Sequence, residues 1–78
     1  MKINLYDGDI PENIKLNDSI AIDSETMGLN PKRDKLCLVQ ISNGDDVCHL
    51  VKIDISDKKP KNLIRMLKNK KILKIFHF

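Results

Sequence analysis

The sequence contains no apolar run that approaches the roughly 18 residues of a membrane-spanning helix, so we expect no membrane association. Cysteine is scarce: Cys37 and Cys48 are too few for the disulfide framework of a small secreted domain. The pattern of a secretory signal peptide is also absent from the first residues. We therefore predict a cytoplasmic protein with reduced thiols. Its 78 residues allow one domain at most.

Acidic side chains are absent after residue 57, and this absence divides the chain by charge. Residues 1–57 carry six basic and eleven acidic side chains, a net charge of −5. Residues 58–78 carry eight basic side chains and a net charge of +8. Such a division suits a protein that holds cations in one place and a polyanion nearby. A solvated, lysine-rich helix explains the basic segment equally well.

Four segments have the pattern of strands. Residues 2–6 alternate and predict a short strand. Residues 19–26 predict a buried strand with a polar end, and residues 35–42, apolar on both faces, predict a central strand. The "NGDD" stretch at 43–46 predicts a tight hairpin turn, so residues 47–53 should return antiparallel.

The hairpin register has a consequence for the two thiols. A tight turn at 43–46 pairs residues whose numbers sum to about 89 or 90. Cys37 then faces residue 52 or 53, and Cys48 faces residue 41 or 42. The two cysteines are several residues out of register, so no disulfide is expected.

The basic end of the chain predicts a helix and a last strand. Residues 60–68 predict a helix with Pro60 in its first turn and with Leu63, Ile64 and Leu67 packed inward. Residues 71–78 predict a strand, and a helical crossover makes it parallel to an earlier neighbour. The predicted fold class is therefore α/β, with a three-stranded antiparallel meander, one helix and one parallel strand.

Two carboxylates, Asp23 and Glu25, lie near the end of the predicted strand at 19–26. Side chains of a strand alternate, so Asp23 and Glu25 point to the same face, with Cα atoms about 6.5–7 Å apart. Oxygen ligands select hard cations such as Mg²⁺ or Mn²⁺. Two such ions about 3.5–4 Å apart are a device for phosphodiester cleavage. Taken alone, the pair is better explained as a strand end that dips into solvent. Its surroundings favour a metal site, because it ends a buried strand and Gly28 behind it leaves room for a ligand.

A longer motif surrounds this pair. The segment "IAIDSETMGLNPKRDKLCLVQIS" contains D-x-E-T-x-G-L followed by P-x-R-D-x-L-C-L-x-Q-I-S, and the chain ends on K-I-F-H-F. These motifs resemble the DEDD 3′–5′ exonucleases, most closely the ribonuclease D branch. The resemblance implies a ribonuclease H-like mixed sheet, of which the predicted elements are the first half. Residues 1–78 would then be the N-terminal part of an incomplete 3′–5′ exonuclease domain.

This fold needs helices on both faces of its sheet, whereas the sequence predicts a single helix. One face of the predicted strands should therefore be bare. The apolar residues from which its exposed surface is expected to be drawn are Ile20, Ile22, Leu36, Leu38, Ile72, Phe76 and their neighbours.

The resemblance also implies roles for individual residues. Asp23 and Glu25 are the implied catalytic carboxylates and would hold two Mg²⁺ or Mn²⁺ ions. Thr26 is implied to contact the 3′-terminal nucleotide, with Met27 or Leu29 packed on its base; the alternatives are a turn residue and loop-to-core packing. The implied partner is nucleic acid, namely the 3′ end of single-stranded RNA, with tRNA-like precursors among the substrates.

Two of the four acids that the family requires are missing, because the chain stops four residues before the second motif's aspartate. The general base is a tyrosine in the ribonuclease D branch, and Tyr6 is in the wrong region for it. His49 and His77 are expected to be sheet residues rather than ligands. We therefore expect the isolated chain to be inactive unless a second chain supplies the rest. The alternatives are a non-catalytic nucleic-acid-binding remnant that uses the basic segment 58–74, and a degenerate product.

Overall fold

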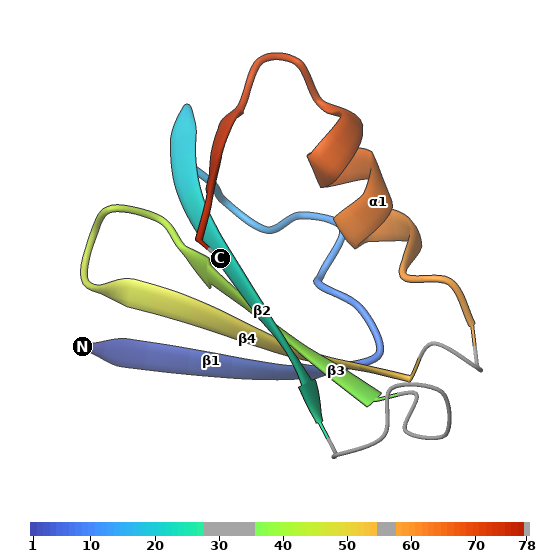
Figure 1. Ribbon diagram of the computed structural model, residues 1–78. Coiled ribbons are helices and arrows are strands. Elements are labelled where there is room, and N and C mark those ends of the chain that lie inside the picture. Colours follow the sequence, from blue (N-terminus) through green and yellow to red (C-terminus); the bar gives the residue numbers. More distant parts are fainter. Residues whose placement is uncertain (28–35, 55–57, 78) are drawn as a thin grey trace.

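The computed structural model describes residues 1–27, 36–54 and 58–77. Within these ranges the chain forms a five-stranded sheet and one helix (Figure 1). The elements are β1 (Lys2–Asp7), β2 (Ser19–Met27), β3 (Leu36–Ser42), β4 (Val47–Asp54), α1 (Lys61–Lys68) and β5 (Leu73–Phe76). No helix among them is long and apolar enough to cross a membrane. Gly28 and Pro31 predict a loop at residues 27–34, which lie outside the described ranges except for Met27, the last residue of β2.

The sheet has the predicted mixed topology, with strand order β1-β4-β3-β2-β5. Strands β2, β3 and β4 form the antiparallel meander, and β5 runs parallel to β2 after the helical crossover. Strand β1, whose neighbour was not predicted, runs parallel to β4. The fold class predicted from the sequence is therefore confirmed.

The hairpin register is also as predicted. Cys37 pairs with Ile53, and Ser42 pairs with Cys48. Both cysteines are free thiols, and they lie at separate positions of this pairing, as the predicted register requires. Gly44 in the turn has a φ of +80°, a left-handed conformation that glycine adopts without a steric penalty.

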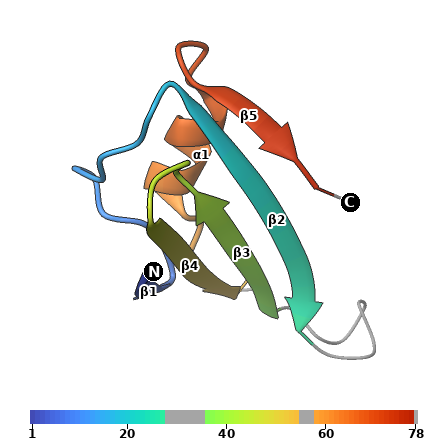
Figure 2. The same ribbon diagram turned by 90° about the vertical axis from the view of Figure 1, so that its left-hand side faces the viewer.

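The core lies between helix α1 and one face of the sheet, and Figure 2 shows the strands crossing in front of the helix. Ile20 and Ile22 of β2 face this core, with exposed fractions of 1% and 4%. Because strand side chains alternate, Asp23 and Glu25 point to the opposite face. The other core residues are Ile10, Val39, Ile41, Val51, Ile53, Leu63 and Met66.

The inward face of helix α1 differs from the prediction. Leu63 is buried and Ile64 is half-buried, as expected, but Leu67 is 40% exposed. Met66 is buried in its place, at 6% exposure. Residues three apart lie on the same side of a helix, so Leu63 and Met66 form one apolar line, and the long methionine side chain reaches the core.

The final strand is shorter than predicted and largely uncovered. Strand β5 spans Leu73–Phe76, and the exposed fractions of Leu73, Ile75 and Phe76 are 63%, 49% and 52%. One face of the sheet has no described helix over it, as the presence of a single helix predicts. The prediction was wrong in placing Ile20, Ile22 and Ile72 among the residues of that bare face, because Ile20 and Ile22 lie in the core beneath α1 and Ile72 packs against that core.

Asp9 supplies the N-terminal cap that helix α1 lacks locally. Pro60 precedes the helix and makes no side-chain capping bond, and the first turn contains no acid. The Asp9 carboxylate instead accepts hydrogen bonds from the backbone N–H groups of Asn62 and Leu63, each at 2.9 Å. It also accepts one from Ile10 N–H at 2.8 Å. One carboxylate thus fixes α1 to the segment that follows β1.

Asp9→Ala is therefore expected to lower the free energy of unfolding by about 1–2 kcal/mol, because it leaves helical N–H groups without their acceptor. Urea denaturation followed by circular dichroism measures the loss. Asp7→Ala, which removes an exposed carboxylate two residues earlier, is the matched control. Equal stability of the Asp9 and Asp7 variants would show that the cap contributes nothing.

His49 is a sheet residue, as predicted. It is buried, and its ring stacks on that of Tyr6 between β4 and β1. Its exposed fraction is 6%, and the ring centroids of Tyr6 and His49 are 5.7 Å apart. The Tyr6 hydroxyl lies 3.1 Å from His49 Nδ1. Burial lowers the pKa of His49 below its ordinary value of 6.5, and the nearby Asp45 carboxylate offsets part of that effect.

This pKa gives the stability a defined pH dependence. The unfolded chain takes up a proton on His49 near pH 6.5, whereas the folded chain takes it up only at lower pH. Stability is therefore fully present above pH 6.5 and falls as the pH drops below it. In His49→Gln, we expect the thermal unfolding midpoint to change less between pH 7.5 and pH 5.5 than it does in the unmodified chain. This window extends about one unit to either side of the ordinary pKa. Tyr6→Phe, which keeps the titrating ring, should retain the slope.

Candidate active site

Strand β2 carries Asp23 and Glu25 on the face of the sheet opposite to helix α1. Both carboxylates are exposed. Across the antiparallel pairing with β3, Asp23 lies opposite Gln40 and Glu25 lies opposite Leu38. The two carboxylates therefore share one open face, as alternation predicted, and their Cα atoms are about 6.5–7 Å apart along the strand.

A shallow depression surrounds Asp23. It is lined by Ala21, Ile22, Asp23, Gln40, Ser42 and His77. The His77 backbone N–H donates to the Ile22 carbonyl at 2.9 Å, which continues the β2–β5 pairing beyond β5. The His77 side chain is exposed, and it lines the depression together with Asp23. The sequence prediction treated His77 as a residue that supports the sheet; its backbone does so, and the residue also lines the depression around Asp23.

The donor set at this place fits a hard divalent cation but does not complete a site for one. Carboxylate oxygens are the ligands that Mg²⁺ and Mn²⁺ prefer, and Mg²⁺ requires six in octahedral geometry. Among the described residues, no group of three or more histidine, cysteine, aspartate or glutamate side chains could hold a metal ion. Asp23 and Glu25 thus form a pair of candidate ligands with open coordination positions.

The remaining predicted contacts are only partly placed. Thr26 and Met27 are the last two residues of β2, where their backbones pair with Cys37 and Leu36. The structure does not describe their side chains. Leu29 lies outside the described residues. The predicted roles of Thr26, Met27 and Leu29 at the 3′-terminal nucleotide therefore stay predictions.

The helical part of the basic segment 58–74 does not adjoin the carboxylates, whereas Lys74 at its end lies on β5 and pairs with Ile20 of β2. Helix α1 packs through Leu63 and Met66 on the core face of the sheet, whereas Asp23 and Glu25 occupy the other face. The helical lysines are exposed, and Arg65 lies 3.9 Å from Glu12. Nucleic acid held by α1 would thus lie across the sheet from the candidate ligands.

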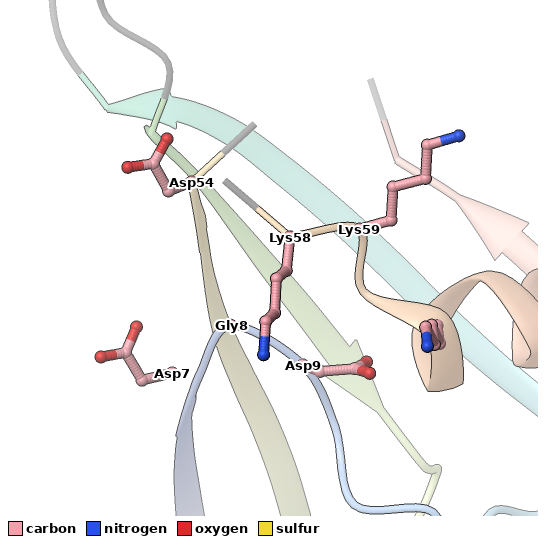
Figure 3. Close-up of a pocket in the computed structure, with 7 residues that line it drawn as sticks. Asp7, Gly8, Asp9, Asp54, Lys58 and Lys59 are labelled. Atoms are coloured by element: carbon pink, nitrogen blue, oxygen red, sulfur yellow. The ribbon is translucent and has the colours of Figure 1, made fainter. Parts of the chain in front are cut away.

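The start of the basic segment borders a pocket of mixed charge. The pocket is lined by Asp7, Gly8, Asp9, Asp54, Lys58, Lys59 and Lys61. Figure 3 shows the Lys58 side chain extending toward the turn at Gly8, with Asp7 and Asp9 on either side. Three carboxylates and three ammonium groups line this pocket, so it is not the uniformly positive groove that a phosphate backbone requires.

A mixed sheet whose acid-bearing strand leads into an antiparallel meander, with a helical crossover to a parallel strand, matches the ribonuclease H-like exonuclease fold. The sequence profile of the 3′-5′ exonuclease family matches residues 9–78. The chain belongs to this family. The predicted resemblance to DEDD 3′–5′ exonucleases is thus confirmed at the level of the family.

Solved structures similar to this chain are nucleases. Brucella melitensis NrnC with bound Mg²⁺ is 48% identical in sequence, with a TM-score of 0.79. The same protein bound to pGG is also 48% identical, with a TM-score of 0.78. The apo form of a nuclease is 40% identical, with a TM-score of 0.82. Each match covers 100% of this chain and 39% of the other chain. No curated protein sequence matches the chain.

Proposed function

We propose that this chain contributes the first two metal ligands of a 3′–5′ exoribonuclease that acts on the 3′ end of single-stranded RNA. The observation that carries the proposal is the placement of Asp23 and Glu25 on one exposed face of β2. Family membership supports exonuclease chemistry, and the similar NrnC structure bound to pGG supports RNA as the substrate. The ribonuclease D branch and tRNA-like precursors are the narrower form of this proposal.

The chemistry is hydrolysis of the terminal phosphodiester. Water attacks the phosphorus, the bond to the 3′ oxygen breaks, and a nucleoside 5′-monophosphate leaves. A bound pair of Mg²⁺ or Mn²⁺ ions would activate that water and stabilise the leaving oxygen. Asp23 and Glu25 would hold these ions from one side, and Thr26, Met27 and Leu29 would contact the terminal nucleotide. The other ligands would come from outside residues 1–78, in the same chain or in a second one.

A chimera tests this proposal directly. This chain replaces the matching 39% of Brucella melitensis NrnC, with the remainder of that protein following it. With 5′-labelled single-stranded RNA and Mg²⁺, we expect a ladder of products shortened one nucleotide at a time from the 3′ end. Denaturing gel electrophoresis resolves the ladder.

Three matched substrates sharpen the result. The same RNA with a 3′-phosphate should resist trimming, because the terminal nucleotide is blocked. A DNA of the same sequence should be trimmed more slowly, since the proposal names RNA. A tRNA-like precursor with a 3′ extension tests the ribonuclease D form. Internal cleavage of the 3′-blocked RNA would contradict an exonuclease, and equal rates on DNA would contradict RNA as the substrate.

A further inference from the structure

Strand β1 forms one edge of the sheet, and its backbone is left open on one side. It pairs with β4 over residues Lys2 to Asp7 without a bulge. The Lys2 N–H donates to the Asp46 backbone carbonyl at 2.8 Å, and the Gly8 N–H donates to the Lys52 backbone carbonyl at 2.7 Å. Backbone groups of successive strand residues point to opposite sides, so those of Ile3 and Leu5 point away from β4.

The free edge is apolar where natural edges are usually protected. Ile3 and Leu5 are 59% and 73% exposed, and both side chains lie on the open face of the sheet. No proline or bulge interrupts the strand, and inward-pointing charges are absent from its centre. Figure 1 shows that the segment after β1 turns toward α1, away from this edge.

We propose that β1 is a self-association edge, on which a second copy of this chain docks its own β1 in antiparallel orientation. The two five-stranded sheets then form one continuous sheet across a two-fold axis. This inference goes beyond the exonuclease proposal and does not depend on it.

The sequence of β1 is complementary to itself in a single register. A two-fold axis normal to the sheet keeps the two open faces on the same side, so partner residue numbers must sum to an even value. With a sum of 8, Ile3 lies opposite the partner's Leu5, and Asn4 lies opposite the partner's Asn4. Ile3 and Leu5, whose backbone groups are free, then exchange the hydrogen bonds.

Charge and side-chain packing favour the same register. Lys2 lies opposite the partner's Tyr6, and no two like charges face each other directly. Ile3 and Leu5 of both copies form one apolar cluster of four side chains on the open face. A shift to a sum of 6 shortens the ladder, and a shift to a sum of 10 keeps its length but places the apolar Ile3 opposite the partner's Asp7. A shift of one residue turns the two open faces to opposite sides.

A pair of charge-swapped variants tests the proposal. One variant carries Ile3→Glu with Leu5→Glu, and the other carries Ile3→Lys with Leu5→Lys. Each alone places like charges opposite each other, so the dimer dissociation constant should rise by about tenfold or more over that of the unmodified chain. An equimolar mixture should restore a one-to-one dimer that weakens with salt. Sedimentation velocity across a concentration series measures all of these species.

The matched control is the other apolar edge. Leu73→Glu with Ile75→Glu introduces the same charges on β5 and should leave dimerisation through β1 unchanged. Unaltered association of the β1 variants, or a mixture that stays monomeric, would overturn the proposal. So would loss of the dimer in the β5 variant alone.

A cross-link verifies the register even if the charged variants fail to fold. Asn4→Cys places two thiols opposite each other at a non-hydrogen-bonded pair, where Cα atoms are about 4.5 Å apart and a disulfide can form. Mild oxidation should give a dimer linked by a disulfide between the two introduced thiols, identified by peptide mapping. Lys2→Cys, which faces the partner's Tyr6, should not link to itself. Absence of the Asn4→Cys product, or equal linking by the Lys2→Cys variant, would refute the register.

Discussion

In the chimera with the NrnC remainder, Asp23→Ala is expected to lower the rate of 3′ trimming by more than about 100-fold, and Glu25→Ala by as much. Removing a residue that merely orients a metal ligand lowers metal affinity or activity by about 10–100-fold. Removing the ligand itself should lower the rate by more than that. Both carboxylates are exposed, so neither substitution disturbs the core. Single-turnover trimming of 5′-labelled RNA measures the effect.

The control and a second readout separate metal binding from folding. Asp18→Ala removes another exposed carboxylate just before β2 and should leave the rate unchanged. The Asp23→Asn variant keeps the side-chain shape but weakens the ligand, so the Mn²⁺ concentration needed for half-maximal rate should rise. A fully active, folded Asp23→Ala chimera would show that the metal site lies elsewhere in the domain.

The topology of the meander could be predicted from the sequence because local signals agree with one another. Gly44 in the turn sets the register of β3 and β4, and the apolar run of β2 marks it as a buried strand. The position of β1 could not be predicted, because its pairing with β4 joins residues far apart in the sequence. No turn signal or spacing near Lys2–Asp7 indicates that β4 is the strand with which β1 pairs.

The inner face of α1 and the bare face of the sheet were predicted less well, for related reasons. Both depend on which side of the sheet the helix covers. Periodicity alone makes Leu67 and Met66 similar candidates for burial, and only packing against the sheet selects Met66. The same packing buries Ile20 and Ile22, which the sequence prediction placed on the bare face.

At the candidate site, alternation along β2 was enough to place Asp23 and Glu25 on one face, but not to identify their neighbours. Gln40 is brought there from β3 by the hairpin register, and His77 from beyond β5 by the parallel pairing. Each contact is long-range. The charge pattern likewise did not reveal that the basic helix and the carboxylates lie on opposite faces of the sheet.

The isolated 78-residue chain is expected to bind Mn²⁺ or Mg²⁺ no more tightly than the millimolar range, as weak oxygen-ligand sites do at about 10⁻⁴–10⁻³ M. Two exposed carboxylates leave most of the coordination sphere to water, and Mg²⁺ dehydrates reluctantly. Titration calorimetry should show weak heats that vanish in Asp23→Ala and persist in Asp18→Ala. Two tight sites in the isolated chain would contradict this expectation.

Without tightly held ions, the same isolated chain should show no 3′ trimming of labelled RNA with Mn²⁺. Both the attacking water and the leaving oxygen depend on the ions, and a missing general base costs about 10²–10⁴-fold by itself. The chimera under identical conditions is the positive control, and it separates an incomplete site from a misfolded segment. Trimming by the pure short chain that Asp23→Ala abolishes would mean that residues 1–78 hold a complete site, and it would contradict this expectation.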